Sequence, residues 1–173
     1  MSRTWSVAIT LAGVLSAHIV ASKPQAEEWP KAPPDIQLLV RSAIADRIKA
    51  NDVPDLDLRF GRNRAVSIRR EMTRTRMMLT DEAVPQVEGF SFTLRTRAAL
   101  QAEADRTQRV TPMFIIVNGA GIAGEQGVIE LGTDILLPTG KDGKLCCCRG
   151  NATFTRSVEG WTFGSWNKSV VCS

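Results

Sequence analysis

The residues with the most versatile chemistry in this chain are four cysteines, Cys146, Cys147, Cys148 and Cys172. No two of them have the Cys-x-x-Cys spacing of a redox motif. Three consecutive cysteines cannot converge on one zinc ion, because neighbouring side chains of a strand point to opposite faces. We therefore expect neither redox catalysis nor a metal site, and in an exported chain we expect a structural disulfide.

Histidine chemistry depends on one residue, His18, in an N-terminal segment typical of a secretory signal peptide. Residues 1–22 carry a single charge, Arg3, and an apolar run over residues 7–21 that ends in small residues. The run is shorter than the roughly 20 apolar residues of a membrane span, and a retained anchor is the alternative. Cleavage after Ser22 would remove the only histidine, which excludes Ser-His-Asp triads, Cys-His pairs and histidine-ligated zinc. We expect a periplasmic or secreted protein without a cofactor.

Glu130 and Asp134 are the candidate pocket acids. Both lie on the polar face of a strand predicted over residues 128–137, whose other face carries Ile129 and Leu131. An extended strand separates them by about 13 Å, at roughly 3.3 Å per residue, so they cannot act as one catalytic pair. The pattern also fits two carboxylates that face solvent, and we favour a protein that is not an enzyme.

An arginine-rich stretch between residues 59 and 76 contains one acid, Glu71. Its arginines could bind a polyanion or an anionic membrane surface. Charge runs are more commonly solvated, and only Phe60 is available for stacking, so we prefer an exposed strand face or loop. The formal net charge of +4 is mild, and an exported protein has little access to nucleic acid. The arginines are Arg59, Arg62, Arg64, Arg69, Arg70, Arg74 and Arg76.

The elements that position these residues form one domain over residues 35–173, after a linker rich in proline and charge over residues 23–34. The domain is expected to begin with a helix that has Asp35 as its N-cap and one apolar face. That face consists of Ile36, Leu39, Val40, Ala43, Ile44 and Ile48.

The rest of the domain is predicted to be mainly strands. Short strands are expected at residues 56–60, 65–68 and 90–94, before a helix over residues 97–106 that Thr96 caps. Gly119 and Gly121 are expected in a loop that is not a phosphate loop, because a strand and not a helix follows. The fold class is α+β, with the N-terminal helix packed on a curved, mainly antiparallel sheet. Its main strands are residues 110–117, 128–137, 145–156 and 161–172, joined by loops at 118–127 and 139–144 and a turn at 159–160.

The last hairpin predicts where the disulfide forms. A two-residue turn at Glu159-Gly160 would place Cys172 opposite Cys147. A one-residue bulge near Gly164 would move the partner of Cys172 to Cys148. We expect the Cys148–Cys172 bridge, with Cys147 as the alternative partner. The bridge would close a loop of about 25 residues and stabilise the fold by about 3 kcal/mol.

Three stretches carry a family resemblance: a strand ending near Val117, the strand Gly127-Val128-Ile129-Glu130-Leu131, and the hairpin Phe154-Thr155-Arg156…Glu159-Gly160-Trp161-Thr162-Phe163. They resemble the nuclear-transport-factor-two-like superfamily. The resemblance implies an α+β cone, in which a curved antiparallel sheet wraps around an N-terminal helix. Enzymes of this superfamily, such as ketosteroid isomerases, use Asp, Tyr or His in the mouth of the cone. This chain has no Tyr and would lose its His on processing.

The expected function is that of a small exported accessory or binding domain, without catalysis, whose partner is another protein or an apolar small molecule. A ketosteroid-isomerase-like enzyme, with Glu130 or Asp134 as its acid, is one alternative. The other is an envelope protein that binds polyanion or anionic lipid through the arginine-rich stretch.

Overall fold

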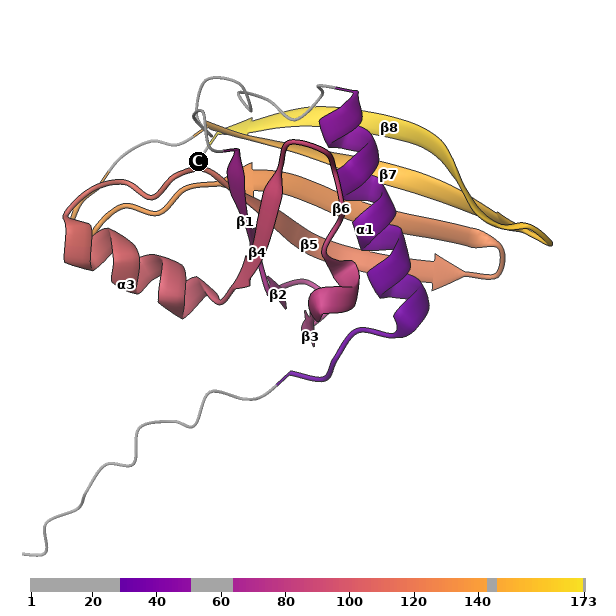
Figure 1. The fold of residues 1–173 in the computed structure, drawn as a ribbon, viewed down its shortest axis with the longest axis horizontal. Coiled ribbons are helices and arrows are strands. Elements are labelled where there is room, and N and C mark those ends of the chain that lie inside the picture. The colour runs from indigo at the N-terminus through magenta and orange to yellow at the C-terminus, as the bar shows by residue number, and fades with distance from the viewer. Residues whose placement is uncertain (1–28, 51–63, 143–145, 173) are drawn as a thin grey trace, which may run out of the picture.

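The fold is α+β: one mixed, mainly antiparallel sheet carries two helices in the part of the chain that the structure describes (Figure 1). The structure, a computed structural model, describes residues 29–50, 64–142 and 146–172. The predicted class and the mainly antiparallel character of the sheet are confirmed. The strands lie in the order β4-β1-β5-β6-β7-β8, with bounds β1 (Ala65–Arg69), β4 (Ser91–Arg95), β5 (Phe114–Ala123), β6 (Gln126–Asp134), β7 (Cys146–Ser157) and β8 (Gly160–Cys172).

The sheet combines two pairing patterns. Strands β5 to β8 form an antiparallel meander, whereas β1 lies parallel to both β4 and β5. Between β1 and β4 the chain forms a small second sheet of β2 (Glu71–Met72) and β3 (Met77–Met78), followed by a 3-10 turn, η1 (Asp81–Ala83). The strands expected at residues 65–68 and 90–94 are present, and the one expected at residues 56–60 lies outside the described residues.

Helix α1 (Pro34–Lys49) crosses in front of the meander in Figure 1. It begins at Pro34, and Pro33 at the N-cap makes no side-chain cap bond. The prediction of Asp35 as the cap is wrong, because a proline at the first helical position has no N–H that needs a partner. Asp35 lies in the first turn, and its Oδ2 is 3.4 Å from Nη1 of Arg156.

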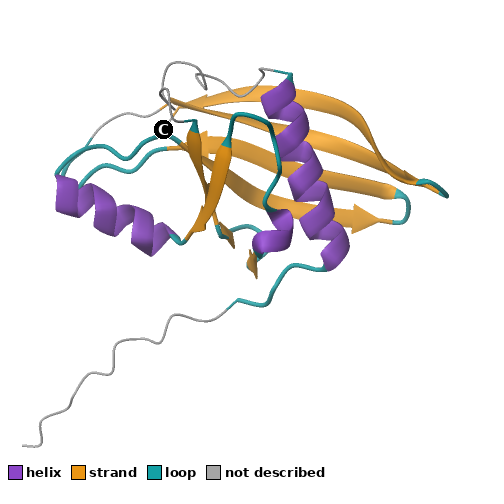
Figure 2. Cartoon of the chain, in the orientation of Figure 1, coloured by secondary structure: helices purple, strands orange, loops and turns teal. Residues whose placement is uncertain are grey.

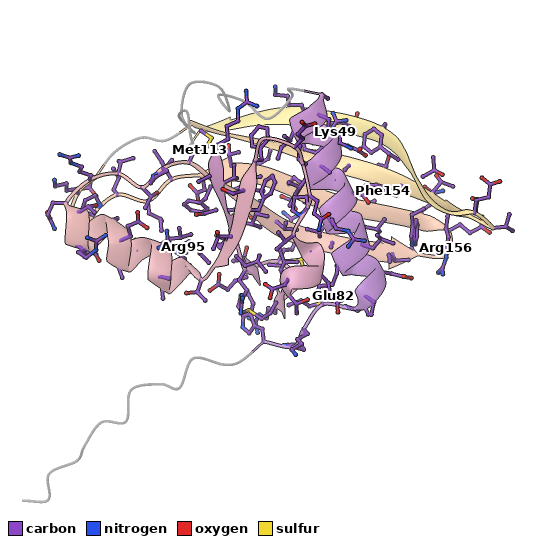
Figure 3. All side chains as sticks on the ribbon, in the orientation of Figure 1. Lys49, Glu82, Arg95, Met113, Phe154 and Arg156 are labelled. Atoms are coloured by element: carbon purple, nitrogen blue, oxygen red, sulfur yellow. The ribbon has the colours of Figure 1, made fainter. Side chains whose placement is uncertain are left out.

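The two faces of the sheet have different covers. Leu39 and Ile44 of α1 are buried in one cluster with Ile129 of β6 and Phe154 of β7. Figure 3 labels Phe154. We call this the inner face of the sheet and the opposite face the outer face. Residues alternate between the faces along each strand, so Glu130 lies on the outer face.

The second helix, α3 (Arg97–Thr107), covers one end of the outer face, at the far end of the molecule from the β7–β8 turn in Figure 2. Its Leu100 is buried with Phe114 and Ile116 of β5. Oγ1 of Thr96 accepts the N–H of Ala99 at 3.1 Å, which confirms the predicted N-cap. The helix predicted over residues 97–106 is therefore correct to within one residue.

Strand β5 is longer than the sequence suggested. The loop expected at residues 118–127 is wrong, because β5 continues to Ala123 and β6 begins at Gln126. Gly124, with φ of 59°, and Glu125 make the turn. Asn118 is an extra residue in β5, since Val117 pairs with Leu131 but Gly119 pairs with Glu130. This β-bulge allows the strand to continue through what looks like a glycine-rich loop.

The β7–β8 hairpin turns one residue earlier than predicted. Its turn is Val158-Glu159, and Ser157 pairs with Gly160, whose φ of 116° suits only glycine. The predicted bulge near Gly164 is present, since Thr153 pairs with Ser165 but Phe154 pairs with Phe163.

The earlier turn shifts the whole hairpin by two positions, so Cys146 lies opposite Cys172 and Cys148 lies opposite Val170. The register predicted for Cys148 or Cys147 opposite Cys172 is therefore wrong. The cysteine side chains lie outside the described part of the structure, and the disulfide itself stays a prediction.

Part of the expected linker is paired with the domain. Ala32 is buried, its N–H donates to the carbonyl of Met78 at 2.9 Å, and the Met78 N–H donates to the carbonyl of Pro30 at 2.8 Å. Structured chain therefore begins upstream of Asp35. The segment predicted to be a signal peptide, residues 1–22, lies outside the described residues.

Candidate functional site

A shallow hollow on the outer face is the best candidate for a binding site. Its volume is about 320 Å³, which is at the lower end of the range for ligand pockets. Strands β5, β6 and β7 form its floor, and the chain between β2 and β3 forms one wall. The lining residues are Arg74, Thr75, Gly119, Ala120, Gly121, Val128, Glu130 and Asn151.

Arg74 is held in place by the bulge in β5. Its backbone N–H donates to the carbonyl of Asn118 at 2.7 Å. Its side chain then runs over Gly119, where an added Cβ would lie only 3.4 Å from the Arg74 stem. Nη1 of Arg74 ends 2.7 Å from Oε2 of Glu130. The bulge and the glycine together let an arginine from outside the six-stranded sheet reach across β5 to a carboxylate on β6.

The carboxylate of Glu130 is engaged on both oxygens. Oε2 pairs with Arg74, and Oε1 accepts a hydrogen bond from Nδ2 of Asn118 at 3.5 Å. The side chain of Glu130 is 15% exposed, whereas that of Arg74 is 72% exposed. Solvent and ligands therefore reach the guanidinium more easily than the carboxylate.

The floor of the hollow is bare backbone. Gly119 and Gly121 both face outward from β5, and an added Cβ at Gly121 would meet no atom within 4 Å. Beside them Val128 is 43% exposed, and the exposed side chain of Asn151 lies on β7 opposite Glu130. Glycines inside a strand often mark a place where a ligand or another backbone comes close. The arrangement offers a flat apolar floor with a guanidinium and an amide at its rim.

Asp134, the second candidate acid, belongs to a different environment. It lies at the end of β6 and helps to keep the buried guanidinium of Arg69 charged. Desolvation lowers the pKa of Arg69, and the charges of Asp134 and Glu71 oppose that shift. Nε of Arg69 donates to the carbonyl of Glu71 at 3.1 Å. Glu130 and Asp134 thus each face an arginine, and the structure does not bring them together at one site.

The arginine-rich stretch does not form a single exposed row in its described part. Arg69 is buried, and Arg74 pairs with Glu130. The guanidinium of Arg64 lies 5.0 Å from the ring centroid of Phe90, and Arg70 is half-buried. Arg76 is exposed, while Arg59 and Arg62 lie outside the described residues.

Glu71, the acid inside that stretch, serves a structural purpose. Its two carboxylate oxygens accept the backbone N–H of Arg97 at 3.0 Å, at the first residue of α3. A carboxylate is favourable there because it satisfies an N–H with no partner inside the helix and faces the positive end of the helix dipole. Two further acids lie near these arginines, Asp134 near Arg69 and Glu130 beside Arg74. Both come from β6, far along the sequence, so counting charges within the stretch could not find them.

A second cluster of arginine and aromatic side chains lies on the inner face beside α1. The guanidinium of Arg47 lies 4.8 Å from the ring centroid of Phe163 and 5.4 Å from that of Trp166. Arg156, which Figure 3 labels toward the β7–β8 turn, lies 5.5 Å from the ring of Trp161. The Arg47 contacts join α1 to β8, and the Arg156 contact joins β7 to β8. No pattern in the sequence indicated that Arg47 would take part.

The described residues contain no group of three or more His, Cys, Asp or Glu side chains that could hold a metal ion. None of the helices among them is long and apolar enough to span a membrane. No family model, no curated protein and no solved structure matches this chain.

Proposed function

We propose that this protein is a small exported binding domain, without catalysis of its own, that holds a small molecule in the outer-face hollow. The observation that carries the proposal is the pairing of Arg74 with Glu130 beside a floor of bare backbone. The hollow has the size of a small ligand pocket, and Glu130, the acid among its described lining residues, is already paired with Arg74.

The same pairing argues against a ketosteroid-isomerase-like enzyme. A general base must be free to take a proton from its substrate. Both oxygens of Glu130 already accept hydrogen bonds or pair with a cation, and Asp134 lies near Arg69 at another place on the sheet. Removal of residues 1–22 would also remove the only histidine, and the chain contains no tyrosine.

The chemistry of the hollow selects the class of ligand. The exposed guanidinium of Arg74 has N–H donors beyond the one that meets Glu130, and they suit a carboxylate or carbonyl oxygen. Val128 and the glycine floor suit an apolar or flat body, and Asn151 can donate or accept at the rim. A small organic carboxylate with an apolar body combines these features.

Export and the superfamily resemblance belong to the same proposal. The helix followed by an antiparallel meander, closed by the Gly160-Trp161 hairpin, supports a nuclear-transport-factor-two-like relative. The parallel pairing of β1 with β4 and β5 departs from the antiparallel sheet of that superfamily. Cleavage after Ser22 would leave α1 and the sheet intact, because both lie downstream of it.

The test is a ligand titration of the chain from Lys23 to Ser173. Benzoate, phenylacetate and hexanoate serve as probes, and the change in melting temperature with probe concentration reports binding. The matched variants are Gly121→Val, which fills the hollow where a Cβ meets nothing, and Ala123→Val, on the same face of β5 but outside the hollow.

We expect a probe to raise the melting temperature of the wild type and of Ala123→Val but not of Gly121→Val. Circular dichroism would show that both variants fold. Failure of every probe at millimolar concentration, or binding that Gly121→Val leaves unchanged, would contradict the proposal.

A further inference from the structure

The outer-face hollow contains two opposite charges in direct contact. Nη1 of Arg74 lies 2.7 Å from Oε2 of Glu130, and both residues line the hollow. The described lining residues therefore carry no net charge. A ligand whose single charge is a carboxylate would meet Arg74 favourably, but it would also bring a second negative charge close to Glu130, which is unfavourable. A ligand that carries a positive charge beside its carboxylate would avoid this cost.

We infer that the hollow takes a free α-amino acid with an apolar side chain. An α-amino acid carries its carboxylate and its ammonium group on one carbon atom, so its two charges match a pair of opposite charges that are themselves in contact. The ligand carboxylate would lie against Arg74, and the ligand ammonium group would lie against Glu130. This inference rests on the proposed function and narrows its ligand from organic carboxylates to amino acids.

The wall between β2 and β3 offers donors for the ligand carboxylate. The side chain of Arg74 is 72% exposed, and its guanidinium has N–H groups beyond the one that meets Glu130. Thr75, the next residue, also lines the hollow, and its buried hydroxyl has no hydrogen-bond partner among the described residues. A buried hydroxyl without a partner is unfavourable, and a ligand oxygen at this wall would supply one.

Strands β6 and β7 offer acceptors for the ligand ammonium group. An ionised carboxylate has about four lone-pair sites, and the contacts of Glu130 with Arg74 and Asn118 occupy two of them. Asn151 lies opposite Glu130 on β7, and its exposed amide oxygen can accept another N–H. Accepting these hydrogen bonds requires no proton transfer, so the role suits a carboxylate that is not free to act as a general base.

The glycine floor leaves room for the side chain of the amino acid. A Cβ added at Gly121 meets no atom within 4 Å, and the neighbouring Val128 offers an apolar surface that is 43% exposed. The ionic contacts should be modest in strength, because water surrounds much of Arg74. We therefore expect weak binding that added salt weakens further.

Isothermal titration calorimetry of the chain from Lys23 to Ser173 tests the inference with matched ligands. Phenylalanine is compared with hydrocinnamate, which is the same molecule without the amino group, and with phenethylamine, which lacks the carboxylate. Glu130→Gln removes the negative charge of the hollow and nearly keeps the shape of the side chain. Glu125→Gln makes the same change at an exposed acid in the β5–β6 turn, outside the hollow.

We expect the wild type and Glu125→Gln to bind phenylalanine at least about tenfold more tightly than hydrocinnamate, because an ammonium group adds a hydrogen bond to a charged partner. Glu130→Gln should bind the two ligands alike, and its binding of hydrocinnamate would show that the hollow is intact. Phenethylamine should bind more weakly than phenylalanine to every form, because its ammonium group has no carboxylate beside it to meet Arg74.

Two results would overturn the inference and leave the proposed carboxylate site standing. One is a wild type that binds hydrocinnamate as tightly as phenylalanine, and this comparison needs no variant. The other is a preference for phenylalanine that Glu130→Gln preserves, which would place the ammonium group elsewhere. If neither ligand bound at millimolar concentration, the proposed function would fail together with the inference.

Discussion

The contact between Leu39 of α1 and Gly127 of β6 makes a sharp test of how the helix holds the sheet. Leu39 is fully buried, and a Cβ added at Gly127 would lie 2.7 Å from Cδ1 of Leu39 and 3.3 Å from Trp161. Leu39→Ala should cost about 3 kcal/mol, within the usual range of about 2–5 kcal/mol for a buried leucine. For a chain of this size, that lowers the melting temperature by roughly 6–12 °C.

Gly127→Ala should also destabilise the fold, by about 1–3 kcal/mol, because the new methyl group overlaps Leu39. In the double variant, the methyl group enters the space that Leu39 has left. The double variant should then lose less unfolding free energy than the two single variants lose in total, with a coupling of at least about 1 kcal/mol.

Urea unfolding of the wild type, both single variants and the double variant measures this coupling. Leu38→Ala, at the half-buried neighbouring position, is the control and should be additive with Gly127→Ala. If Leu39→Ala and Gly127→Ala were also additive, or if Leu39→Ala left the unfolding midpoint unchanged, then α1 would not pack on the sheet through this contact.

Three further predictions concern the cysteines, processing and pH. Non-reducing peptide mapping should find Cys146 joined to Cys172, because the register makes these two residues direct neighbours. Cys148 lies two residues farther along β7, beyond the reach of a disulfide to Cys172. A Cys148–Cys172 peptide would mean that the register of the hairpin differs from the one described. N-terminal sequencing of the exported protein should begin near Lys23, and recovery of intact Met1 from membranes would favour a retained anchor. The pKa of Asp105 is lowered, first by the backbone N–H of Thr139 and then by Gln101, so its contribution to stability is present above the ordinary pKa of a carboxylate and is lost as pH falls through the lowered value. Asp105→Asn should therefore flatten the loss of stability below about pH 4 in acid unfolding curves, and an unchanged curve would contradict this.

Local signals in the sequence were reliable where the residues that decide a structure are close together. The apolar spacing of α1 and the Thr96 cap of α3 act within one or two turns, and both elements lie where they were expected. The β7–β8 bulge was also found from the break in alternation at Gly164. The turn was misplaced by one residue because Gly160 was assigned to the turn, whereas it is the first paired residue of β8.

Features that depend on distant residues were not predictable in the same way. Gly119 and Gly121 resemble loop residues, yet they continue β5 because their outer side is left open for Arg74 and the hollow. The pairing of Arg74 with Glu130 joins segments that have no common pattern. The parallel pairing of β1 with β4 and β5 depends on two connections, one from β1 to β4 through β2, β3 and η1 and one from β4 to β5 through α3. Spacing within a strand does not encode it.

The extra residue in β5 acts as a phase shift along that strand. Before Asn118, odd-numbered residues such as Val117 face α1, and after it, even-numbered residues such as Ala120 do. Deletion of this one residue would turn Gly119 and Gly121 toward the core and Ala120 toward solvent. The length of the strand is therefore fixed at this point, since a single deletion exchanges the two sides of its distal half.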